Sequence, residues 1–74
     1  MTSTTRAMTP AEKGQRYARI FRKAGVFLAK GNIPRAVAVL KEGQALAGGL
    51  GDRIMAERFA TEIESATAPA KTGQ

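Results

Sequence analysis

Apolar residues recur at a spacing of three or four along three segments of the chain, which is the pattern of amphipathic helices. The first segment begins at Thr9-Pro10-Ala11-Glu12. A threonine cap, a proline in the first turn and a glutamate three residues after the cap are typical of a helix start with a capping box. We predict a helix from Thr9 to Lys30, whose single apolar stripe contains Tyr17, Ile20, Phe21, Ala24, Phe27 and Leu28.

The polar positions of this first helix are mostly cationic. Helical geometry places five of them away from the apolar stripe, on an outer face that contains Arg16, Arg19, Arg22, Lys23 and Lys30. Gly14 and Gly25 lie on the flank of the stripe, although glycine inside a helix costs about 1 kcal/mol relative to alanine. We expect these two glycines to allow a close helix crossing.

Two further helices are predicted downstream. Gly31 is a suitable helix stop, and Asn32 is a suitable cap for a helix from Ile33 to about Ala47. The run from Gly48 to Gly51 ends that helix, and a third helix follows, capped by Asp52 and with an apolar stripe of Met55, Phe59, Ala60 and Ile63. No segment alternates with a period of two, so the predicted fold class is all-α, with three helices.

The two ends of the chain carry no apolar period. We predict a flexible leader at residues 1–8, a helical domain at 9–65 and a flexible tail at 66–74, where Pro69 and Gly73 stand among small residues. The leader has no targeting pattern, and the longest apolar stretch is far below the roughly 20 residues that a bilayer span needs. We therefore expect a cytoplasmic protein with no membrane span.

The composition removes most catalytic and metal chemistry. The 74 residues contain no cysteine and no histidine, so disulfides, thiolate ligands and imidazole bases are excluded. Ser3 and Ser65 have no histidine to activate them, and the glycines of 48–51 are not followed by the lysine and hydroxyl residue of a phosphate-binding loop. We expect no enzyme activity, no cofactor and no metal ion.

The charge is uneven along the chain. The net charge is +6, with nine cations and one acid in residues 1–41, and three cations and five acids in residues 42–74. Such an asymmetry favours a nucleic acid, an acidic protein or an anionic membrane as partner, although a solvated helix face carries similar charges. The candidate residues for a partner or polyanion are Arg16, Arg19, Arg22, Lys23, Lys30 and Arg35.

The middle of the chain resembles a tetratricopeptide-repeat hairpin. The family's small residue, aromatic residue, glycine-containing turn and following alanine correspond to Ala24, Phe27, Gly31-Asn32 and Ala36. The resemblance covers roughly residues 20–59, ends on a Leu-Gly-Asp turn at 50–52, and departs from the family at Lys23, at Gly43 and in the closing proline. It implies an antiparallel hairpin followed by a third helix. It also implies that peptides or helices bind in the groove between the helices. A generic three-helix bundle is the alternative fold.

One repeat and one additional helix leave apolar surface uncovered, since such repeats normally need about three neighbours to close a core. We therefore expect a non-catalytic protein–protein interaction module that binds an acidic partner or itself, with a homodimer through the Tyr17, Phe21 and Leu28 edge. The alternative is a small nucleic-acid-binding protein that uses the cationic face. A helix-turn-helix reader or a helix lying on a membrane would use the same face. The predicted core or interface residues are Tyr17, Phe21, Phe27, Leu28, Leu40 and Phe59.

Overall fold

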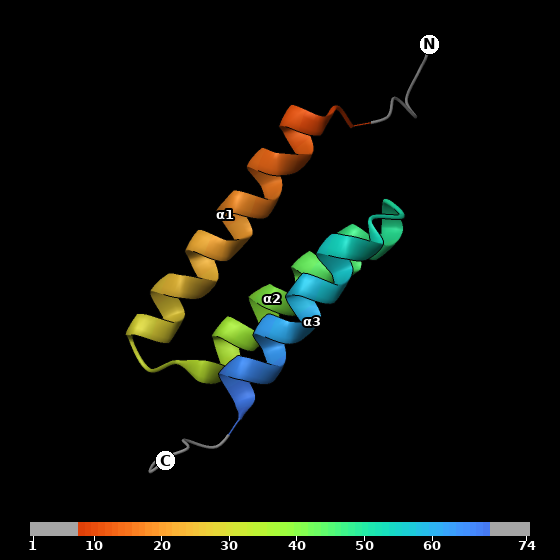
Figure 1. The fold of residues 1–74 in the computed structure, drawn as a ribbon. Coiled ribbons are helices and arrows are strands. Elements are labelled where there is room, and N and C mark those ends of the chain that lie inside the picture. The colour runs from red at the N-terminus through yellow and green to blue at the C-terminus, as the bar shows by residue number, and fades with distance from the viewer. Residues whose placement is uncertain (1–7, 69–74) are drawn as a thin grey trace.

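Three α-helices make up nearly all of residues 8–68, which are the residues that the structure, a computed structural model, describes. Helix α1 spans Pro10–Ala29, α2 spans Ile33–Gly49 and α3 spans Arg53–Thr67. Figure 1 shows that α1 and α3 run in one direction and that α2 runs in the opposite direction. The all-α prediction with three helices is confirmed.

The start of α1 is the predicted capping box. The backbone N–H of Glu12 donates to Thr9 Oγ1 over 3.1 Å, and the Thr9 N–H donates to Glu12 Oε1 over 2.9 Å. These two bonds satisfy two donors that a helix start otherwise leaves without partners.

The two turns between the helices are built in the same way. Gly31 and Gly51 have φ angles of 77° and 74°, a left-handed conformation that glycine adopts without strain. In each turn the next residue starts the following helix: Asn32 Oδ1 accepts from the Arg35 N–H, and Asp52 Oδ1 accepts from the Met55 N–H. The predicted stop and both predicted caps are therefore confirmed.

Two predicted helix ends are wrong by two residues. Helix α2 continues past Ala47 to Gly49, since a glycine only weakens a helix by about 1 kcal/mol and the first residue with a positive φ is Gly51. Helix α3 continues past Ser65 to Thr67, so the predicted tail at 66–74 begins too early. Ala68 is extended because a residue before proline avoids the helical region. Of the predicted leader at 1–8, only Met8 lies within the described residues.

Helix α2 is the centre of the molecule. Both α1 and α3 pack against it, whereas α1 and α3 approach each other closely at very few backbone positions. Phe59 of α3 and Leu40 of α2 are the largest fully buried side chains. The other buried residues are mostly small, and they are Tyr17, Ala24, Ala36, Val39, Gly43 and Ala47.

Gly43 is the glycine that permits close packing, and Gly14 and Gly25 are not. A Cβ atom on Gly43 would lie 2.8 Å from Cδ1 of Phe59 and would overlap the ring. No atom of a neighbouring element lies within 4 Å of a Cβ atom built on Gly14 or Gly25. The predicted close crossing at those two positions is wrong, because both face open space rather than another helix.

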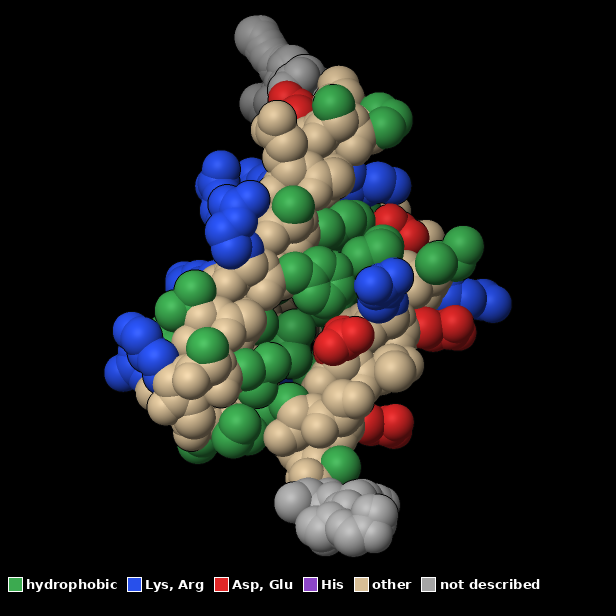
Figure 2. Space-filling view, turned by 60° about the vertical axis from the view of Figure 1, so that its left-hand side comes forward, with side chains coloured by type: hydrophobic (Ala, Val, Ile, Leu, Met, Phe, Trp, Pro, Cys, Tyr) green, Lys and Arg blue, Asp and Glu red, His purple; other side chains and the backbone are tan. Residues whose placement is uncertain are grey.

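Aromatic rings connect α1 to α3 on one face of the molecule. The Phe21 ring stacks on the Phe59 ring with centroids 4.5 Å apart, and the Tyr17 ring lies 5.7 Å from the same ring. The Arg58 guanidinium lies 5.7 Å from the centroid of Phe21. Figure 2 shows apolar side chains filling the space between α1 and α3 on this face.

Candidate interaction groove between α1 and α2

A groove runs along the outer seam between α1 and α2. Two hollows form it, and Glu42 lines both of them. Its floor is apolar, with Ile20 and Phe27 from α1 and Val39 and Leu46 from α2. Val39 is buried, but Ile20, Phe27 and Leu46 are only half-buried. We call this surface the α1–α2 groove, and a partner that covered it would bury these three side chains further.

The spacing of residues on α1 explains how the groove acquires charge. Arg16, Ile20, Lys23 and Phe27 follow one another at intervals of four, three and four residues, so they form one row along the helix. Arg19 lines the same hollow as Arg16 and Ile20. Cationic and apolar side chains therefore alternate along the α1 side of the groove.

Helix α2 contributes a cation to the other end of the groove. Arg35 lines the hollow that contains Lys23 and Phe27, and its guanidinium lies 5.9 Å from the centroid of the Phe27 ring. A guanidinium above an aromatic face is a favourable arrangement that holds the charge beside the apolar floor. We call the four residues around the groove the cationic rim: Arg16, Arg19, Lys23 and Arg35.

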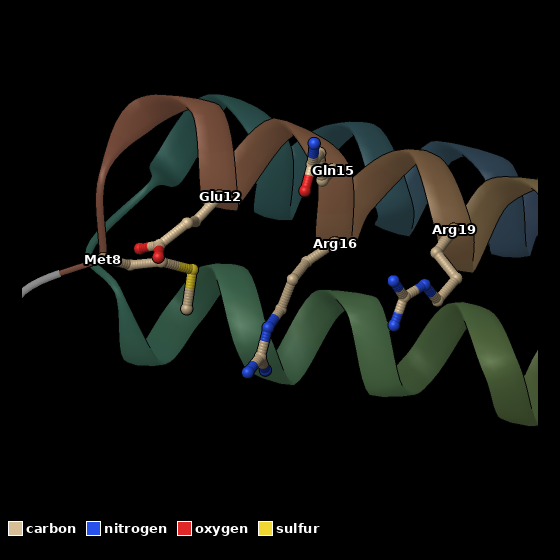
Figure 3. A pocket seen from close by; sticks show the side chains of 5 residues that line it. All are labelled: Met8, Glu12, Gln15, Arg16 and Arg19. Atoms are coloured by element: carbon tan, nitrogen blue, oxygen red, sulfur yellow. The ribbon is translucent and has the colours of Figure 1, made fainter.

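The cationic rim forms no ion pair among residues 8–68, although Glu42 lines both hollows of the groove. None of its members lies within 4.0 Å of a carboxylate oxygen in that part of the chain, and all are exposed. Figure 3 shows Arg16 and Arg19 reaching from α1 toward α2, beside Met8, Glu12 and Gln15. Positive charge at the groove is therefore available to an external ligand.

The structure divides the predicted cationic set into two groups. Arg16, Arg19, Lys23 and Arg35 meet at the groove, while Arg22 lines a different hollow together with Gln15, Ala18 and Arg19. Lys30 is exposed at the C-cap of α1. The sequence places these cations on one outer face, but the position of α2 determines which of them stand beside apolar surface.

The predicted apolar set also divides. Tyr17, Leu40 and Phe59 are buried in the core, and Phe21 and Phe27 are half-buried. Leu28 remains 39% exposed. Of the edge expected to form a homodimer, Tyr17 and Phe21 already pack against Phe59 within the molecule, so Leu28 is its one exposed residue.

A polar cluster that sequence reasoning missed joins the start of α3 to α1. Asp52 accepts a hydrogen bond from the Tyr17 hydroxyl over 3.1 Å, and Lys13 Nζ lies 3.4 Å from the same carboxylate oxygen. Burial, followed by the nearby carboxylate, raises the pKa of Tyr17. The Met55 N–H, with Tyr17 and Lys13, lowers the pKa of Asp52 despite partial desolvation. Only the capping role of Asp52 was readable locally, since its other partners are 35 and 39 residues away along the chain.

The outer face of α3 differs in charge from α1. No carboxylate of α3 lies within 4.0 Å of a cation in residues 8–68. The i, i+4 neighbours Arg53 and Glu57 therefore form no ion pair. Among the apolar side chains of α3, Ile54 is 77% exposed. In Figure 2 most Lys and Arg side chains lie along α1, and most Asp and Glu side chains lie on the side of α3.

Comparisons with protein families, curated proteins and solved structures find no match to this chain. Among the described residues, no helix has both the length and the apolar character needed to cross a membrane. That same part of the chain contains no cluster of three or more acidic residues that could hold a metal ion. The groove is therefore interpreted from its own chemistry.

Proposed function

We propose that this chain is a non-catalytic protein–protein interaction module whose α1–α2 groove binds an acidic, apolar segment of a partner protein. The observation that supports it is the combination of half-buried Ile20, Phe27 and Leu46 with a cationic rim that lacks internal carboxylate partners. A segment with apolar residues on one side and carboxylates on its flanks complements both features.

The two features have different physical roles. Covering a half-buried aliphatic or aromatic side chain contributes part of the roughly 1.5–3 kcal/mol that full burial provides, so the floor supplies most of the affinity. An exposed ion pair adds only about 0.2–1 kcal/mol, but charge complementarity raises association rates and fixes register. The cationic rim thus selects which partner binds, and the floor retains it.

The tetratricopeptide resemblance remains a prediction that agrees with this proposal. That family binds peptides or helices in grooves between helices, and its hairpin corresponds here to α1 and α2. The thin core supports the same view, since Phe59 and Leu40 are the only large side chains among residues 8–68 that are fully buried.

Nucleic-acid binding is the second candidate, and the observation favouring it is the cationic surface of α1. Arg16, Arg19, Arg22 and Lys23 are exposed and unpaired among the described residues. Binding to phosphates would depend on total charge and would weaken steeply with salt. It would not require Ile20, Phe27 or Leu46.

A matched pair of variants separates the two functions. Lys23 lines the groove and Arg22 does not, yet Lys23→Glu and Arg22→Glu change the net charge equally. The probe is a synthetic helical peptide with leucines spaced by three and four residues and glutamates on both flanks, measured by fluorescence anisotropy. For groove binding, we expect Lys23→Glu to weaken affinity about tenfold and Arg22→Glu about twofold.

A random-sequence DNA duplex is the second probe, titrated over a salt series. Equal losses in both variants, with tighter binding to the duplex than to the peptide at physiological salt, would support the nucleic-acid function instead. Absence of peptide binding at any salt concentration would contradict the proposed groove.

A further inference from the structure

Helix α3 carries an outward stripe that no other part of residues 8–68 covers. Ile54, Glu57, Thr61 and Glu64 follow one another at intervals of three, four and three residues, so they lie along one face of the helix. This face is opposite the buried Phe59, and all four residues are exposed. We call it the α3 stripe.

The α3 stripe joins an apolar side chain to uncompensated negative charge. Ile54 has the largest exposed fraction, 77%, among the large hydrophobic residues of the described chain. Glu57 and Glu64 have no cation within 4.0 Å in residues 8–68. The hydroxyl of Thr61 donates to the Glu57 carbonyl oxygen over 3.0 Å, so it is already satisfied within its own helix.

A row on α1 has the same spacing and the complementary chemistry. Ile20, Lys23, Phe27 and Lys30 also follow one another at intervals of three, four and three residues. When the two rows are laid side by side in the same direction, Ile54 lies opposite Ile20, Glu57 lies opposite Lys23 and Glu64 lies opposite Lys30. Thr61 then lies over the half-buried Phe27. In the opposite direction, with Ile54 on Ile20, Glu57 would lie beside Arg16, but Glu64 would lie beside Pro10, so only one of the two glutamates would meet a cation.

We propose that the segment bound by the α1–α2 groove is α3 of a second copy of this chain, with its Ile54 on the groove floor and its Glu57 and Glu64 paired with Lys23 and Lys30. This inference rests on the proposed function, because it uses the same groove. The two contacting surfaces differ, so after contact one copy keeps a free stripe and the other keeps a free groove. Further copies can therefore add, and heterologous contacts of this kind form closed rings or open filaments larger than a dimer.

The net charge of +6 opposes this contact. Local attraction between two glutamates and two lysines works against the repulsion between whole molecules, so the association is expected to be weak. At physiological ionic strength, salt largely screens charges that are more than about 8 Å apart, so it weakens both the attraction and the repulsion. We therefore place the test at high protein concentration, from micromolar to millimolar, where weak self-association is measurable.

Sedimentation of two complementary variants tests the proposal. Ile54→Lys disables the stripe and leaves the groove intact, whereas Lys23→Glu in the groove, combined with Lys30→Glu at the end of α1, removes both proposed cation partners and leaves the stripe intact. The unmodified chain should reach masses above a dimer as its concentration rises, and each variant alone should remain a monomer. An equal mixture of the two should form a one-to-one dimer and nothing larger, because one intact groove meets one intact stripe.

Controls are needed to exclude a general effect of charge and a loss of folding. Arg22→Glu changes charge as much as one groove substitution but lies outside the groove, so it should leave self-association nearly unchanged. Circular dichroism establishes that each variant is folded, and Ile54→Ser repeats the stripe test with a smaller side chain. Loss of association in Arg22→Glu to the same extent would overturn the proposed register.

The outcome also separates this inference from the proposed function. If the unmodified chain stays monomeric at millimolar concentration while the acidic peptide still binds in a Lys23-dependent way, the second copy is excluded and the groove function stands. If the mixture of variants stays monomeric although the unmodified chain assembles, another surface mediates assembly and the inference is overturned.

Discussion

Gly43 shows how one residue determines the distance between two helices. It is buried on α2, and the ring of Phe59 on α3 occupies the space where a side chain would begin. Because Phe59 is fully buried and also contacts Tyr17 and Phe21, it has little freedom to move away.

We predict that Gly43→Ala destabilises the fold even though alanine favours helix. Overpacking costs about 1–3 kcal/mol, whereas the gain in helix propensity is about 1 kcal/mol, so a net loss of up to about 2 kcal/mol is expected. Gly25→Ala is the matched control, since Gly25 is exposed in α1 with nothing within 4 Å of the added atom. It should stabilise by about 0.5–1 kcal/mol.

Urea unfolding followed by circular dichroism measures both changes. Opposite signs for the two glycines are the expected result. If Gly43→Ala were as stabilising as Gly25→Ala, the Phe59 ring would have to move at almost no cost, and the close α2–α3 approach would not depend on this glycine.

These two glycines also mark what the sequence left undetermined at the residue scale. Spacing placed Gly25 on the flank of an apolar stripe, which suggested a close crossing, whereas Gly43 was identified as a departure from the tetratricopeptide pattern. Which of them meets another helix depends on how the helices rotate about one another. That rotation is set by the packing of Phe59, a contact between residues 16 positions apart in the sequence.

At the scale of the elements, the sequence was most informative where the interaction is local. The capping box at Thr9 and Glu12 and the caps Asn32 and Asp52 were predicted because each bond spans three residues. The groove was only half predicted. Its cations were identified, but the floor residue Leu46 was not, because it becomes part of a surface only when α2 packs beside α1.

Asp52 adds a polar contact between α1 and the start of α3, whose backbones approach each other closely at very few positions. It caps α3 and also receives the Tyr17 hydroxyl and the Lys13 ammonium from α1. Its pKa lies below the ordinary value of 3.8, chiefly because of the Met55 N–H. The folded state therefore favours the ionised carboxylate over the neutral acid. The resulting stability is present at pH values above the ordinary pKa and is lost as the pH falls through the lowered pKa.

We predict that Asp52→Asn reduces this acid sensitivity. Asparagine still caps a helix but does not ionise, so the variant should be less stable than the unmodified chain at neutral pH. The difference should shrink as the pH falls from about 5 through the lowered pKa, because the unmodified chain then loses its carboxylate. Thermal midpoints of both proteins across that pH range measure the effect.

Glu57→Gln is the control for this prediction. Glu57 is exposed and has no cation within 4.0 Å in the described residues. Dilute protein keeps any self-association out of the measurement. Parallel curves for Asp52→Asn and the unmodified chain would mean that the contacts of Asp52 do not distinguish its charged form from its neutral form.

At the scale of the whole molecule, charge is separated between the helices. The cations Arg16, Arg19, Arg22 and Lys23 crowd on α1, while most acids lie on or next to α3. Cations three or four residues apart on one helix repel each other, and each such pair costs about 0.2–0.5 kcal/mol. The surface proposed to bind a partner therefore lowers the stability of the unbound chain.

Arg19 is the centre of this repulsion, since Arg16, Arg22 and Lys23 are all three or four residues from it. We predict that Arg19→Gln stabilises the fold by roughly 1 kcal/mol at low salt, because it removes three unfavourable pairs, and that this gain declines as salt screens the charges. Lys41→Gln is the matched control: Lys41 is exposed on α2 with no cation three or four residues away.

Urea unfolding of the three proteins at low and high sodium chloride tests this account. The midpoint of the unmodified chain should rise with salt, that of Arg19→Gln should rise less, and Lys41→Gln should follow the unmodified chain. A midpoint that falls with salt would mean that attractive pairs dominate the surface. If the prediction holds, a ligand that brings carboxylates to the cationic rim relieves the same repulsion, so bound partner should stabilise the chain most at low salt, where Arg19→Gln has its largest effect.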